Sequence, residues 1–132
     1  MKILKDAFVI AYILAALAAI NFTTAQAGAL NADSIVGKWK DPDGSAVVRI
    51  ENKGGYYEGV VVENAENPGS VTTVVFKNLV YDNTDSIWKG TVYSIKKNKD
   101  FNVKISMDSG DSFTMTVKAG LGSKKFEWAR VE

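Results

Sequence analysis

The amino-acid sequence predicts an all-β domain, an eight-stranded antiparallel up-and-down barrel, that follows an N-terminal signal peptide. Three observations lead to this prediction. From Ile35 onward, short apolar or alternating runs follow one another, residues typical of tight turns separate them, and no stretch carries the period of an amphipathic helix. At 132 residues the chain is also short enough to form a single domain.

The first 27 residues have the layout of a cleavable signal peptide. Lys2 and Lys5 give a positively charged start, and residues 7–20 form an uncharged apolar run. The triplet Ala25-Gln26-Ala27 then places small side chains at the two positions that a signal peptidase reads. We therefore expect cleavage after Ala27 and a periplasmic or secreted protein.

A permanent membrane anchor is the alternative interpretation of this segment. A spanning helix needs about 20 consecutive apolar residues, and the apolar run here ends at Asn21. Cleavage after Ala19 or Ala29 is a further alternative. With cleavage at the expected position, residues 28–34 form a short linker and residues 35–132 form the barrel domain, with no stable membrane anchor and no Cys for lipidation.

Composition removes several classes of function. The chain has no His and no Cys, which excludes thiolate or imidazole metal sites, Cys nucleophiles and Ser-His-Asp triads. Without the signal peptide, basic and acidic residues are equal in number, so no net charge draws the domain to nucleic acid or anionic lipid. The densest basic stretch, residues 96–99, is followed by Asp100 and is typical of a solvated hairpin tip. We expect no nucleic-acid partner.

The first half of the domain contains four predicted strands. They are residues 36–40, 45–51, 56–63 and 72–81. The first turn, Asp41-Pro42-Asp43-Gly44, is favourable because Pro fixes φ at the second position and Gly accepts a positive φ. Residues 52–55 form the next turn, and residues 64–70 form the longest polar connection.

The second half contains four more predicted strands. They are residues 87–95, 101–107, 113–118 and 125–130. The sixth and seventh show the clearest alternation of apolar and polar side chains, which indicates strands with one buried face. The turns between these strands are residues 82–85, 96–100, 108–110 and 119–123.

Eight strands joined in sequence by short turns predict an antiparallel meander. Closure into a barrel removes both edge strands, which otherwise invite aggregation. The interior of an eight-stranded barrel is wide enough to be filled by side chains or to hold one small ligand. A two-sheet sandwich is the alternative, although only the connection at residues 64–70 is long enough to suggest its crossovers.

Two short motifs at the ends of the domain resemble those of lipocalin-like (calycin) barrels. The first strand carries Gly37 and Trp39, and the last carries Trp128 and Arg130. In the lipocalin-like barrels, the Arg packs across the Trp face and seals one end. A cation over an indole is attracted by about 0.5–2 kcal/mol, so this structural role is the preferred interpretation, and anion binding by Arg130 is the alternative.

A second resemblance covers nearly the whole domain. The sequence resembles the bacterial domain-of-unknown-function family numbered 2147, which consists of exported small proteins. The matching stretches are Gly37–Trp39, Asp43-Gly44, Val47–Ile50, Trp88–Tyr93, Gly120–Gly122 and Trp128–Val131. Family members often carry a Cys pair around the second hairpin, whereas this chain has residues 52–55 there without Cys. The resemblance implies a fold and a compartment, but no reaction.

The remaining polar residues predict no enzyme, no metal site and no cofactor. An enzyme without His or Cys needs paired carboxylates, Lys or Tyr in a cleft. The candidate carboxylates lie in turns, where Asp usually caps its own backbone; they are Asp41, Asp43, Asp82, Asp85, Asp108 and Asp111. Residues 82–85 have oxygen donors at calcium-like spacing, but lack the further acidic ligands of an EF-hand loop.

Large aromatic side chains are the basis for a ligand prediction. Binding sites for small molecules are mostly apolar with a few placed polar groups. The candidates for a lining are Tyr57, Phe76, Trp88, Tyr93 and Phe113, with Phe101 nearby. The same side chains are needed to fill the core of a small domain. The sequence therefore allows two alternatives: an interior that binds a small lipophilic molecule, or an interior filled by side chains.

The third predicted strand allows two orientations. Either Tyr57, Gly59 and Val61 face inward, or their neighbours do, and in the second case Glu58 can orient a ligand or pair with Arg130. Tyr56 with Val60 and Val62 forms a candidate outer patch for docking an envelope protein or a glycan. That docking role is the alternative function to ligand binding. Glu63 is the second acidic residue of this strand, and its orientation depends on the same choice.

Overall fold

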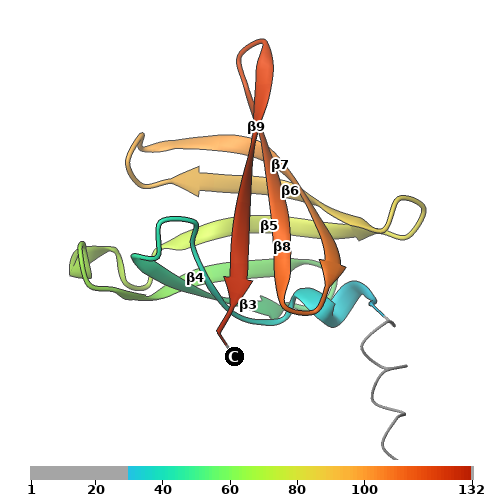
Figure 1. Ribbon diagram of the computed structural model, residues 1–132, viewed down its shortest axis with the longest axis horizontal. Coiled ribbons are helices and arrows are strands. Elements are labelled where there is room, and N and C mark those ends of the chain that lie inside the picture. The colour runs from blue at the N-terminus through green and yellow to red at the C-terminus, as the bar shows by residue number, and fades with distance from the viewer. Residues whose placement is uncertain (1–29, 132) are drawn as a thin grey trace, which may run out of the picture. The chain divides into compact units, whose positions relative to one another are not determined.

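Eight antiparallel strands close into a barrel in the computed structural model, which describes residues 30–131 (Figure 1). In chain order they are β2 (Gly37–Lys40), β3 (Ala46–Asn52), β4 (Tyr57–Asn64), β5 (Val74–Asp82), β6 (Ile87–Ser94), β7 (Lys99–Ser109), β8 (Ser112–Ala119) and β9 (Gly122–Arg130). Each strand pairs with the next, and β9 pairs with β2 through Trp39↔Arg130. The predicted up-and-down barrel is confirmed, and the sandwich is excluded.

The predicted signal peptide, residues 1–27, and its cleavage position lie outside the described residues. Within residues 30–131, no helix is long and apolar enough to cross a membrane. The helical elements in this range are two single 3-10 turns, η2 (Ala32–Ile35) and η3 (Pro68–Ser70).

Side-chain alternation places the core inside the barrel. On β8, Phe113, Met115 and Val117 are buried, while the residues between them are more exposed. The orientation of β4 is now fixed, because Tyr57 and Val61 are buried in the same phase. Glu58 therefore lies on the outer surface, where its carboxylate is 3.9 Å from Lys53 Nζ.

Two glycines let neighbouring strands approach each other closely inside the barrel. A Cβ on Gly59 would lie 2.7 Å from Phe76 Cδ2, so the Phe76 ring occupies the space that a side chain would need. A Cβ on Gly90 would lie 2.8 Å from the carbonyl oxygens of Lys77 and Asn78. At this point β5 has an irregular register and Asn78 adopts φ 52°. The glycines thus accommodate the bends that close a small barrel.

The N-terminal boundary of the folded unit differs from the sequence prediction. Residues 28–34 were expected to form a linker, but η2 folds against the barrel and buries Ile35. The Asn31 side chain accepts from Asp33 N, and Ser34 Oγ accepts from Asn31 N, which together cap this short turn. A single 3-10 turn is too short to produce an apolar period, so the alternation pattern does not reveal it.

The last hairpin is also longer than expected. Residues 119–123 were predicted to be a turn, but the pairing of β8 and β9 continues to Ala119↔Gly122. The turn itself is therefore Gly120-Leu121, and Gly120 has the positive φ, 60°, that suits the first position of a two-residue hairpin turn. The Gly-rich composition of this stretch hides its strand pairing from sequence patterns.

Candidate ligand-binding cavity

One end of the barrel is closed by η2. Three side chains from the barrel wall bind its backbone and its acidic side chain: Trp39 Nε1 donates to Ile35 O at 2.9 Å, Trp88 Nε1 donates to Ala32 O at 3.0 Å, and Tyr57 Oη donates to Asp33 Oδ1 at 2.6 Å. These contacts come from β2, β6 and β4, so they hold the turn across the barrel opening. We call this region the closed end.

Arg130 fastens the closed end from β9. Its guanidinium carbon lies 4.2 Å from the centre of the Trp39 ring. The guanidinium donates to the carbonyl oxygens of Gly110 at 2.6 Å, Val36 at 3.0 Å and Ser34 at 2.6 Å. Burial lowers the pKa of Arg130 from its usual value, while Asp111 acts in the opposite direction. This geometry is that of a structural closure, because backbone carbonyls occupy the donors that an anion would need.

The Tyr57–Asp33 contact perturbs the titration of the phenol. Burial raises the pKa of Tyr57 to about 12, and the hydrogen bond to the Asp33 carboxylate and its charge add to the shift. Ionisation would place a second negative charge beside Asp33 and remove the donor. The contact therefore favours the neutral phenol and keeps η2 attached.

Aromatic rings fill the centre of the barrel. Phe113 stacks on Trp128 with ring centres 5.6 Å apart, and its ring meets the Trp39 ring edge-on at 4.7 Å. Phe76 contacts both Phe113 and Trp128 edge-on. These rings form a continuous layer from the closed end to the middle of the barrel, so ligand space is confined to the opposite half.

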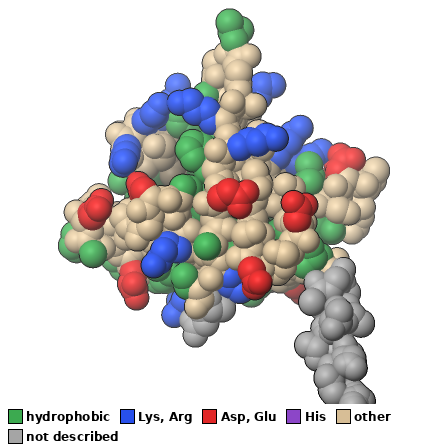
Figure 2. Space-filling model, in the orientation of Figure 1, with side chains coloured by type: hydrophobic (Ala, Val, Ile, Leu, Met, Phe, Trp, Pro, Cys, Tyr) green, Lys and Arg blue, Asp and Glu red, His purple; other side chains and the backbone are tan. Residues whose placement is uncertain are grey.

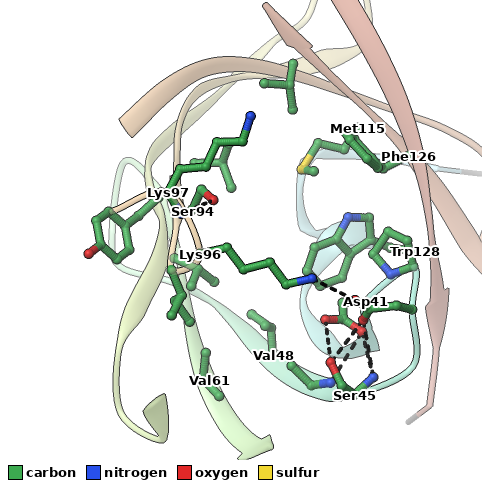
Figure 3. A pocket seen from close by; sticks show the side chains of 18 of the residues that line it. Asp41, Ser45, Val48, Val61, Ser94, Lys96, Lys97, Met115, Phe126 and Trp128 are labelled. Carbon is green, nitrogen blue, oxygen red and sulfur yellow. Dashed lines mark hydrogen bonds and ion pairs between the residues drawn. The ribbon is translucent and has the colours of Figure 1, made fainter. Parts of the chain in front are cut away.

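The opposite half of the barrel contains a cavity of about 610 Å³ (Figure 3). Its inner wall is formed by apolar side chains from the seven strands β3 to β9, including Val48, Val61, Val92, Val117 and Trp128. The β6–β7 turn and the β2–β3 turn form parts of its rim. We call this region the open end. A volume of 300–1,000 Å³ with apolar walls is the usual range of a small-molecule site.

The Trp128 indole at the cavity wall has an unmatched donor. Trp128 is only 7% exposed, and its Nε1 is buried without a hydrogen-bond partner. The other two Trp indoles, in contrast, donate to carbonyls of η2. An unpaired buried donor costs about 1–3 kcal/mol and is uncommon in folded proteins. The Trp128 ring lines the cavity, but Nε1 itself is not exposed there.

Charged side chains form the cavity rim. Asp41 Oδ1 accepts from the backbone amides of Ser45 and Ala46, and Asp43 Oδ1 accepts from Ser45 Oγ. Burial raises the pKa of Asp41, whereas the hydrogen bond from Ser45 lowers the pKa of Asp43. These carboxylates cap their own turn, as turn aspartates commonly do.

Over residues 30–131, one long-range ion pair spans the rim. Lys96 reaches from the β6–β7 turn toward the turn that contains Asp41 and Ser45 (Figure 3), and its Nζ lies 3.8 Å from Asp43 Oδ2. The Lys96 side chain is 87% exposed. Such an exposed pair contributes little stability, so it does not hold the rim closed.

The predicted lining residues separate into three positions. Tyr57 and Trp88 hold η2 at the closed end, and Phe76 and Phe113 fill the centre. Tyr93 borders the cavity, as does Phe101. Tyr93 contacts Asn98 through its hydroxyl and carries Lys77 Nζ 5.2 Å above its ring.

Several cavity residues were not singled out from the sequence as ligand contacts. They are Val48, Val61, Val75, Val92, Met115, Val117 and Phe126, together with Trp128, which was assigned to barrel closure. Their alternation on the strands identifies them as inward-facing. It does not tell which end of the barrel each one faces, because that depends on the register between strands. The interior is thus filled at one end and open at the other.

The outer patch suggested by the sequence lies on β4. Val60 and Val62 occupy its outward phase and are half-buried, and Tyr56, just before the strand, is 38% exposed. Docking of an envelope protein or a glycan at this patch stays a prediction.

The predicted turn at residues 82–85 is held by Asp82. Its carboxylate accepts from the amides of Thr84 and Asp85 and from Lys89 Nζ, so it also caps its turn.

Comparison with known proteins assigns this chain to a family. No curated protein matches the sequence. Among solved structures, the chain is similar to protein HP1028 of Helicobacter pylori, described as belonging to the lipocalin family, with a TM-score of 0.60 and 17% identity. The match covers 74% of this chain and 83% of that one, and at this identity it shows the fold alone. Residues 37–130 match the family described as uncharacterised proteins conserved in bacteria, DUF2147, and the chain belongs to that family.

Proposed function

We propose that the protein is a non-enzymatic, exported binding protein that holds one small apolar or amphipathic molecule in the open end of its barrel. The observation that carries this proposal is the cavity of about 610 Å³ with its apolar wall, which includes the Trp128 ring. A lipocalin-like barrel is compatible with such a role.

The distribution of polar groups favours an amphipathic ligand. The wall of the cavity is formed by Val, Met, Phe and Trp side chains, whereas Asp and Lys side chains gather at the rim. A ligand in this site would bury its apolar part and keep its polar end near solvent, since burial of an unpaired polar group is costly.

Contact quenching of Trp fluorescence tests the proposal. Bromododecanol is an uncharged amphipathic probe, and its bromine quenches indoles only at short range. We expect saturable quenching with one site per chain. The Trp128→Phe variant is expected to lose most of it, because Trp39 and Trp88 lie at the closed end.

A matched pair of variants separates cavity binding from surface adsorption. Val117 faces the cavity, and Thr116 lies on the opposite face of the same strand. Val117→Phe should weaken the affinity on the order of tenfold or more by filling the site, equivalent to ~1.4 kcal/mol. Thr116→Phe should leave it unchanged. Equal affinities of the two variants, or quenching that never saturates, would exclude the cavity as the binding site.

A further inference from the structure

The β8–β9 hairpin carries an exposed apolar tip. It stands away from the body of the barrel (Figure 1). Its strands remain paired up to the two-residue turn, and Leu121 in that turn has a relative exposure of 109%. Backbone pairing makes the hairpin a defined support, so Leu121 is presented to solvent at a fixed place.

Lysines surround the base of this tip. Lys118, Lys124 and Lys125 lie within four residues of Leu121, and residues 112–126 contain no Asp or Glu. Lys104 on β7 joins them through the register, because it pairs with Thr116, which pairs with Lys125. In Figure 2 the apolar tip stands above Lys and Arg side chains, while Asp and Glu lie mostly lower on this face.

The lysines of this hairpin lack acidic partners, unlike several others on the barrel. Lys53, Lys77 and Lys89 each form an ion pair with a carboxylate. Over residues 30–131, no ion pair involves Lys104, Lys118, Lys124 or Lys125. Positive charge is therefore concentrated on this hairpin and at Lys104 of β7, although basic and acidic residues are equal in number over residues 28–132. Net charge alone gave the expectation of no lipid footprint, and it cannot report this separation.

We propose that the β8–β9 hairpin docks the protein on an anionic phospholipid bilayer. Leu121 enters the interfacial region, and Lys118, Lys124 and Lys125 face the headgroup phosphates. An apolar tip within a ring of lysines matches a surface that is negatively charged outside and apolar beneath. Docking brings the cavity close to the bilayer, because Ala119, Lys124 and Phe126 of the same hairpin line it.

Vesicle sedimentation with the full chain tests this proposal. We expect binding to phosphatidylcholine vesicles that contain phosphatidylglycerol, weak binding to phosphatidylcholine alone, and a decrease with added salt. The double variant Lys118→Gln/Lys125→Gln should bind on the order of 25-fold more weakly, from about fivefold per lysine near an anionic surface. Leu121→Ser should also bind more weakly.

A control double variant removes the same charge elsewhere. Lys40→Gln/Lys53→Gln alters lysines outside the hairpin, and it should retain vesicle binding. Binding that is unchanged in the Lys118/Lys125 or Leu121 variants, or equally weakened in the control, would overturn the proposal. Loss with the lysine variant but not with Leu121→Ser would indicate electrostatic adsorption without insertion and would also contradict it.

The result is independent of ligand binding in the cavity. Bromododecanol quenching in solution should be the same for the wild-type chain and Leu121→Ser, because Leu121 does not line the cavity. Loss of vesicle binding with intact quenching is therefore assigned to the hairpin. Loss of quenching in the wild-type chain would refute the proposed function without affecting the docking test.

Discussion

The two ends of the barrel have similar apolar walls but opposite polar chemistry. At the closed end, Arg130, Trp39, Trp88 and Tyr57 direct their donors to η2 and neighbouring turns. At the open end, Trp128 has a donor without a partner, and rim carboxylates cap their own turn. A barrel of eight strands can thus use one half for stability and leave the other half for a ligand.

This difference shows why strong side-chain contacts alone do not identify a binding site. The Trp39–Arg130 pair has the most distinctive geometry in the domain, yet its hydrogen bonds all go to the chain itself. The cavity, in contrast, is marked by unfilled volume and by a buried donor that lacks an acceptor. Unfilled apolar volume is therefore the basis of the proposed ligand site.

Substitution of Trp39 by Ala should produce the largest loss of stability. Trp39 is fully buried, so we expect the free energy of unfolding to fall by about 3–5 kcal/mol. Phe126→Ala at the open end should cost only about 1 kcal/mol, because Phe126 is half-buried beside the cavity. Urea denaturation followed by circular dichroism measures both. Equal losses would contradict the proposed division of roles between the ends.

Replacement of Arg130 by Met should have the next largest effect. It removes the hydrogen bonds to three carbonyl oxygens and leaves them near an apolar side chain. We expect a loss of about 2–3 kcal/mol, with partial recovery in Arg130→Lys, which keeps the charge but has only one nitrogen. Bromododecanol affinity should not change in either variant that remains folded. A specific loss of affinity would connect Arg130 to the ligand.

Gly59→Ala tests the filled centre of the barrel. The added Cβ would lie 2.7 Å from Phe76 Cδ2, and we expect overpacking to cost about 1–3 kcal/mol. Gly122→Ala is the control, because a Cβ there meets no atom within 4 Å. Thermal unfolding of both variants measures the difference. A neutral Gly59→Ala would show that the Phe76 ring moves freely.

Tyr57→Phe should have the smallest effect at neutral pH, about 1 kcal/mol from one lost hydrogen bond. Its pH dependence is more informative. The pKa of Tyr57 rises from its usual value near 10 to about 12 on folding, so the neutral phenol stabilises the folded state fully below pH 10. That contribution is lost as the pH rises from 10 to 12.

The stability difference between wild type and Tyr57→Phe should therefore shrink over that interval. Comparison of the two proteins cancels the titration of the lysines. Denaturation at pH 8, 10 and 11.5 measures the change. A constant difference would show that the hydroxyl does not hold η2 to the barrel wall.

Sequence patterns predicted much of the fold because strand alternation and turn chemistry are local. Phe113, Met115 and Val117 are inward-facing in the structure, as their spacing indicated. The pairing of Trp39 with Arg130 was anticipated from the resemblance of the end motifs to lipocalin-like barrels, and the cation lies over the indole. The family assignment from residues in the same order was likewise confirmed.

The candidate site was less accessible from the sequence. Aromatic size pointed to Phe76, Trp88 and Phe113, but these pack in the centre and at the closed end. The cavity is lined largely by valines, which have the same pattern in a filled core as in an open one. The net charge also concealed the lysines of the β8–β9 hairpin, because acidic residues elsewhere in the chain offset their charge.

The sequence by itself determined the number of strands and the inward faces of those that alternate clearly. Period-two alternation and turn residues act over a few positions, so they can be recognised without a partner strand. Only the tertiary structure decided which half of the interior is empty and where unpaired charge gathers. Both depend on register between strands, which sets the neighbours of each side chain across the barrel.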